Sequence, residues 1–131
     1  MDGMPLVRDL MDHRFPTVTP ETRMKEAIDL LLKRKLLGVM VVSDQGDLVG
    51  ILSEKDCLKL VLHGGFHQLP DDKVGSYMHP APTPVESRMS IVNAAEIFLG
   101  NTFRRLPVVD SGKLVGQITR RDIVRGMSKY R

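Results

Sequence analysis

The stretch LVGILSEKD at residues 48–56 returns as LVGQITRRD at residues 114–122, 66 positions later when Leu114 is set against Leu48. Both stretches end in a small hydroxyl residue, two further residues and an aspartate. Upstream, matching residues stand 67 positions apart in the pairs Val7 and Val74, Met11 and Met78, Val18 and Val85, Ala27 and Ala94, and Val42 and Val109. A register that holds this long with one deletion indicates a tandem duplication.

Each copy combines one helix with two short apolar runs. Apolar residues recur at helical spacing over residues 24–32 and again over 91–99, which predicts two amphipathic helices. The runs that follow are rich in β-branched residues and too short for helices. Strands are therefore predicted at residues 39–42, 48–52, 106–109 and 114–118. Turn residues between them, DQGD and DSGK, predict one β-hairpin in each copy.

Further elements flank the hairpin of each copy. A last helix is predicted to begin at Ser53, with Leu58, Val61 and Leu62 on one apolar side, and its partner begins at Thr119. Each copy begins with a single apolar turn of helix. The segment that follows this turn is predicted to be extended, because residues before proline avoid the helical region. The unit is β-α-β-β-α, in a mixed α/β (α+β) fold. We expect repeat 1 over residues 1–62, a linker over 63–73 and repeat 2 over 74–131.

Gly50 and Gly116 lie in the middle of predicted strands, where glycine usually weakens the pairing. A β-bulge or close packing against a helix would explain both glycines. Close approach of a ligand to the backbone would explain them as well, and the sequence leaves both explanations open.

The composition is that of a globular protein, with 131 residues, 42% hydrophobic and 27% charged residues, and a formal net charge of +3. No apolar run approaches the roughly 18 residues of a membrane span, and residues 1–10 lack the apolar stretch of a signal peptide. We therefore expect a cytoplasmic protein without a membrane partner. The small net charge does not by itself imply a nucleic-acid partner, and a nucleic-acid role stays a third hypothesis that rests on the basic tail at residues 125–131.

Residue types that carry catalysis or bind metals show no recognisable pattern. Cys57 is the only cysteine, and its counterpart Ile123 suggests a small apolar core position. The four histidines, at positions 13, 63, 67 and 79, lack the spacing of a metal site. No P-loop, nucleophile elbow or zinc-protease motif is present, so neither an enzyme nor a catalytic cofactor is expected.

The repeated hydroxyl-x-x-Asp ending allows two interpretations. Ser53 and Thr119 are ordinary helix N-caps, each worth about 1 kcal/mol, with an acid in the first turn. A capping box, however, prefers Glu or Gln at its third position, whereas both copies have Asp, so Asp56 and Asp122 could face outward. An outward carboxylate can accept hydrogen bonds from a ribose diol, and a helix N-terminus suits phosphate.

Positive charge is concentrated in the second copy. Arg104 and Arg105 precede its first hairpin strand, and Arg120 and Arg121 begin its last helix, whereas the first copy has Leu37-Gly38 and Glu54-Lys55 at these positions. Guanidinium groups suit phosphate. A solvated basic surface is the competing interpretation. If an anion binds, the second copy is better equipped to hold it.

The order of elements, the VxxxM turn, the LPVVD strand and the LVGx(I/L)(T/S)xxD ending together resemble the CBS domain family over nearly the whole chain. The resemblance implies that the two tandem repeats pack through their sheets with pseudo-twofold symmetry and form two clefts for adenosine-containing ligands. Such ligands include AMP, ADP, ATP and S-adenosyl compounds. It also implies a regulatory role, a homodimer, and a partner enzyme or transporter encoded elsewhere.

The resemblance also implies roles for individual residues. The ribose would bind Asp122 or Asp56, with help from the hydroxyl of Thr119 or Ser53, and the basic residues before the LPVVD strand would contact phosphate. Adenine would lie against the extended segment and the first hairpin strand, namely Thr83, Val85, Leu106 and Pro107 in one copy and Thr17, Val18 and Val39 in the other. The competing function is a scaffold that dimerises or docks a partner without a ligand.

Overall fold

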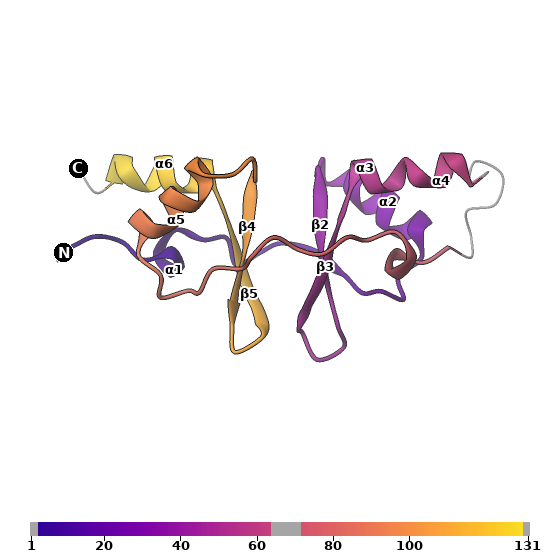
Figure 1. Ribbon diagram of the computed structural model, residues 1–131, viewed down its shortest axis with the longest axis horizontal. Coiled ribbons are helices and arrows are strands. Elements are labelled where there is room, and N and C mark those ends of the chain that lie inside the picture. The colour runs from indigo at the N-terminus through magenta and orange to yellow at the C-terminus, as the bar shows by residue number, and fades with distance from the viewer. Residues whose placement is uncertain (1–2, 64–71, 130–131) are drawn as a thin grey trace. The chain divides into compact units, whose positions relative to one another are not determined.

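The computed structural model describes residues 3–63 and 72–129, and these residues form two compact units. One unit comprises residues 16–81 and the other joins residues up to 15 to those from 82 onward. We call them the Asp56 unit and the Asp122 unit, after the repeated acid that each contains. Both units are mixed helix and strand, which confirms the predicted fold class and the tandem repeat (Figure 1).

The Asp56 unit is built on a three-stranded sheet. Strand β1 (Thr17–Val18) runs parallel to β2 (Gly38–Val42), which pairs antiparallel with β3 (Leu48–Ser53). Helix α2 (Met24–Lys33) connects β1 to β2, and the short helices α3 (Glu54–Cys57) and α4 (Lys59–Leu62) follow β3. A 3-10 turn, η1 (Val74–Ser76), completes the unit.

The Asp122 unit repeats this plan with a two-stranded hairpin, β4 (Arg105–Asp110) and β5 (Lys113–Thr119). Helices α5 (Ile91–Leu99) and α6 (Arg120–Lys129) contact each other beside the hairpin, and α1 (Val7–Leu10) contacts α6 (Figure 1). The counterpart of β1 is a single parallel bridge between Val85 and Val108. The predicted amphipathic helices α2 and α5, both hairpins and the extended segments are therefore present.

The leading turn of each repeat packs into the core that the other repeat builds. Val7 is fully buried with Val85, Leu106 and Ile118, whereas Val74 is fully buried with residues such as Val41. The compact units therefore cross the expected repeat boundaries, because residues 7–11 belong with the second repeat and residues 74–78 with the first. Most of the expected linker, residues 64–71, lies outside the described residues.

The helix after β3 differs from the prediction. The chain forms two four-residue helices that meet at Leu58, and the expected apolar side is exposed at Leu58, Val61 and Leu62. Leu60 instead enters the core, and Cys57 packs partly against it. The predicted apolar side follows from the spacing of residues on one continuous helix. Because the helix is interrupted at Leu58, different side chains face inward. In the described part of the chain, no helix has both the length and the apolarity to cross a membrane.

Candidate nucleotide site

Both repeated aspartates close a reciprocal capping box, although such a box prefers Glu or Gln at this position and the Asp side chains were free to face outward by sequence alone. At the start of α3, the backbone N–H of Asp56 donates to the Ser53 hydroxyl at 3.2 Å, and the Ser53 N–H donates to Asp56 Oδ2 at 2.9 Å. Thr119 and Asp122 repeat the arrangement at 3.1 and 2.9 Å. The extended backbone of the N-cap residue brings its N–H within reach of the shorter side chain.

Asp56 is buried and surrounded by donors. Besides the Ser53 N–H, its Oδ2 accepts from the Ser53 hydroxyl at 3.0 Å and lies 2.6 Å from Nδ1 of His79, while Oδ1 accepts from Lys59 at 3.0 Å. Burial opposes ionisation of Asp56. The hydrogen bonds from the Ser53 N–H, Lys59, His79 and the Ser53 hydroxyl outweigh it and hold the pKa of Asp56 below its ordinary value of 3.8.

Asp122 has fewer donors around it. Its Oδ2 accepts from the Thr119 N–H, and its Oδ1 accepts from the exposed side chain of Arg125 at 3.2 Å. The side chain of Asp122 is 13% exposed, against 6% for Asp56. The second carboxylate is therefore the more accessible of the two, and the exposed Arg125 is the side-chain partner described for it besides Thr119.

Arg105 lies beside the cap of Asp122. It pairs with Thr119 across β4 and β5, so the two side chains leave the same face of the hairpin. Burial lowers the pKa of the Arg105 guanidinium, and among the described residues no carboxylate pairs with it. Gly38 takes the equivalent place opposite Ser53, so the Asp56 unit has no side chain there.

The other three arginines have different environments. Arg120 is turned back onto the protein, where its Nε and Nη2 donate to the Phe103 carbonyl at 3.2 and 2.9 Å. This contact ties the start of α6 to the loop that leads into β4. Arg104 and Arg121 are exposed. The four predicted arginines therefore comprise one half-buried cation, one tether and two surface cations.

The predicted adenine residues separate into exposed and buried positions. Thr17 and Thr83 are exposed, whereas Val18, Val39, Val85, Leu106 and Pro107 are buried. Val85 also uses its backbone in the sheet, because its N–H donates to the Pro107 carbonyl at 3.0 Å and its carbonyl accepts from Val109 at 2.8 Å. The buried members are core residues, and only the threonines present a side chain to solvent.

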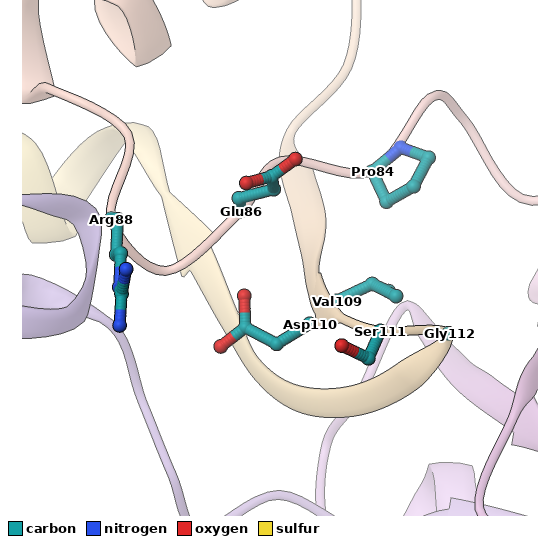
Figure 2. Close-up of a pocket in the computed structure, with 7 residues that line it drawn as sticks. All are labelled: Pro84, Glu86, Arg88, Val109, Asp110, Ser111 and Gly112. Carbon is teal, nitrogen blue, oxygen red and sulfur yellow. The ribbon is translucent and has the colours of Figure 1, made fainter.

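A pocket of about 620 Å³ opens at the other end of the β4–β5 hairpin (Figure 2). It is lined by Pro84, Glu86, Arg88, Val109, Asp110, Ser111 and Gly112. Ser87 holds Asp110 through its hydroxyl at 2.6 Å and its N–H at 3.0 Å, and these bonds lower the pKa of Asp110. None of the predicted ribose- or phosphate-binding residues lines this pocket.

The duplicated cap, hairpin and leading turn recur in a known family. A sequence profile described as the CBS domain matches residues 7–63 and 74–129. The chain belongs to the CBS domain family. Two tandem CBS domains therefore account for nearly every described residue.

Two relatives are CBS domain-containing proteins of Arabidopsis thaliana chloroplasts. CBSX1 is 35% identical to this chain, and the match covers 82% of this chain and 57% of CBSX1. CBSX2 is 34% identical, and the match covers 91% of this chain and 62% of CBSX2. The chain thus spans about three-fifths of these relatives. A crystal structure of CBSX2 in complex with AMP resembles this CBS pair with a TM-score of 0.81. The two sequences are 36% identical, and the match covers 95% of this chain and 96% of the CBSX2 chain.

His79 is the residue that sequence reasoning missed, because histidines were considered only as metal ligands. Its backbone pairs with Ile51, and its ring contacts the acid of the first repeat from a segment of the second. One signal was available in the sequence. The equivalent position in the first repeat is Asp12, so a basic residue in one CBS domain replaces an acidic residue in the other.

Proposed function

We propose that this CBS pair is a regulatory module that binds an adenosine-containing ligand, such as AMP, ADP, ATP or an S-adenosyl compound, in the Asp122 unit. The carrying observation is the half-buried guanidinium of Arg105, which has no carboxylate partner among the described residues and lies opposite Thr119 at the N-terminus of α6. A partly desolvated cation beside a helix N-terminus favours an anionic group such as phosphate. The AMP complex of CBSX2 supports the same ligand class.

Each residue has a separate role in this proposal. The Asp122 carboxylate accepts hydrogen bonds from the ribose hydroxyls, and the Thr119 hydroxyl and the first turn of α6 face the sugar and phosphate. Arg105 binds the phosphate, while Arg104 and Arg121 add surface charge. Arg120 acts indirectly by tethering Phe103. The adenine ring lies against the extended segment at Thr83 and Val85 and the start of β4 at Leu106 and Pro107.

Calorimetry with AMP, ADP, ATP and S-adenosylmethionine on ligand-free protein tests the proposal. Asp122→Asn keeps a side-chain oxygen that can accept from the Thr119 N–H but removes the charge, and Arg105→Ala removes the proposed phosphate contact. We expect each to weaken binding at least tenfold. Arg88→Ala is the matched control, because it removes an exposed arginine from the same unit at the far end of the hairpin. If none of the four ligands gives heat or a shift in melting temperature, the proposal is wrong.

Exposed apolar side chains support a second function as an interaction module. Leu99 on α5 and Val124 and Met127 on α6 are 88%, 64% and 63% exposed. Leu99 and Val124 also line an apolar groove of about 430 Å³ with Phe98 and Ile123. Apolar surface of this kind is typical of protein contacts. We propose that it forms a homodimer or docks a regulated enzyme or transporter.

Sedimentation of wild type and Leu99→Glu separates these outcomes. A dimer that becomes a monomer in the variant supports self-association through α5, whereas a monomeric wild type contradicts it. Repeating the measurement with AMP shows whether the ligand controls assembly. We also propose a cytoplasmic location, which fits the free Cys57 thiol and is tested by fractionating cells that express the tagged chain.

A further inference from the structure

Asp12 and His79 occupy equivalent places in the two units. Asp12 forms an isolated antiparallel bridge with Gln117, through hydrogen bonds of 2.8 and 3.1 Å. His79 forms the same kind of bridge with Ile51, through two hydrogen bonds of 2.9 Å. Gln117 and Ile51 are the same position of the repeated LVGx stretch. The side chains of Asp12 and His79 therefore leave the backbone at corresponding points of the two units.

The two side chains act differently on that aspartate. His79 places Nδ1 2.6 Å from Oδ2 of Asp56, which is the shortest hydrogen bond described for this carboxylate. Asp12 instead accepts from the Arg14 N–H at 2.8 Å, and an ionised carboxylate has no proton to donate to Asp122. One aspartate is therefore covered by a histidine, whereas no described residue covers its counterpart in this way.

The remaining partners of the two acids are largely the same. Lys59 donates to Oδ1 of Asp56, and the equivalent Arg125 donates to Oδ1 of Asp122. Both acids also accept from the N–H of the capping residue. Only the Ser53 hydroxyl adds a further bond, to the oxygen that His79 contacts. The Lys59 or Arg125 cation and the N–H of the capping residue therefore do not distinguish the two acids, whereas His79 and the Ser53 hydroxyl do.

We propose that His79 closes Asp56 to ribose, so that the chain binds one nucleotide, at Asp122. This inference rests on the proposed function, and it adds the residue that decides which repeat binds. A ribose diol needs accepting capacity on the carboxylate, and at Asp56 the Ser53 hydroxyl, the Ser53 N–H and His79 all occupy Oδ2. The residue at position 79 of the Asp56 unit, or at the equivalent position 12 of the Asp122 unit, thus determines whether the nearby aspartate can bind ribose.

Calorimetric stoichiometry with AMP as the probe tests the inference. Wild type and Asp56→Asn are each expected to bind one AMP per chain, while Asp122→Asn binds AMP at least tenfold more weakly. His79→Ala is expected to bind a second AMP, more weakly than the first because Gly38 stands where the Asp122 unit has Arg105, and the double variant His79→Ala/Asp56→Asn loses it. His79→Asn keeps an N–H donor near the position of Nδ1 and is expected to stay at one. Asp12→His, which places a donor beside Asp122, is expected to weaken AMP binding at least tenfold.

The outcomes separate this inference from the proposed function. If wild type binds two AMP and Asp56→Asn loses one, or if folded His79→Ala still binds one, the closure is refuted while nucleotide binding stands. If wild type binds none but His79→Ala binds one through Asp56, the closure stands and binding at Asp122 is refuted. If neither binds AMP, the closure fails, and the proposed function fails with it when ADP, ATP and S-adenosylmethionine give no heat either. The His79 side chain is 43% exposed, and circular dichroism with a melting curve verifies the fold of each variant.

Discussion

Met11 lies directly over Gly116, so closely that a Cβ atom built on Gly116 would stand 2.6 Å from the Met11 sulfur. The same position would place that Cβ 3.1 Å from the backbone oxygen of Asp12. Gly50 stands in the same relation to Met78 and to the backbone oxygen of His79, at 2.9 and 3.0 Å. Both mid-strand glycines also lie at a β-bulge. Packing of the leading segment and the bulge therefore explain these glycines without a ligand.

Gly116→Ala is expected to destabilise the protein by about 1–3 kcal/mol, because the methionine sulfur can move but the backbone oxygen of Asp12 belongs to a paired segment. Urea unfolding measures the loss. Gly100→Ala is the matched control, because its nearest atom, the Glu96 oxygen, is 3.5 Å away and its backbone has a negative φ. Equal stability of the Gly116 and Gly100 variants would contradict the close packing.

Val7→Ala tests the exchange of leading turns between repeats. Val7 is fully buried among residues of the second repeat, so its truncation should cost about 2 kcal/mol and reduce hydrogen-exchange protection in α5 more than in α2. Val74→Ala is the reciprocal variant and should reduce protection in α2 more than in α5. A Val7→Ala protein that loses protection mainly in α2 would show that the turn packs on its own repeat.

Asp56 makes stability depend on acid pH. Its folded pKa is lowered from 3.8, so it contributes stability that is present above about pH 4 and lost as the pH falls through the folded pKa. Unfolding free energies measured from pH 6 down to pH 2.5 should decline less steeply for Asp56→Asn than for wild type. Asp29→Asn, at an exposed ion pair on α2, serves as the control and should follow the wild-type slope.

Arg120→Ala is expected to loosen the loop before β4, because its guanidinium donates twice to the Phe103 carbonyl. Amide exchange of residues 101–105 should accelerate, and AMP affinity should fall about fivefold as Arg104 and Arg105 lose their fixed approach. Arg121→Ala removes the same charge from the same helical turn without touching Phe103. Exchange that accelerates equally in both variants would assign the effect to charge and not to the tether.

The sequence predicted the duplication, the hairpins and the amphipathic helices, because these depend on spacing along the chain. Apolar residues three and four apart must share a helix face, and Asp-Gly turns join neighbouring strands. The stripes were accurate at Met24, Ala27 and Leu31, which are buried, but not at Leu32, which is exposed. Ser53 and Thr119 were placed correctly as caps, since capping is a local interaction. The reach of Asp back to the cap depended on backbone angles that composition does not reveal.

The sequence alone determined that two copies of one unit exist and that the second copy carries the arginines. Only the tertiary structure decided which leading turn completes which core, because the copies match so closely that either pairing satisfies the same apolar pattern. The same exchange brings His79 of one repeat to Asp56 of the other. The register of the β4–β5 hairpin places Arg105 opposite Thr119, half-buried and without a carboxylate partner among the described residues. Contacts between residues distant in sequence, and not their spacing, therefore distinguish the two aspartates.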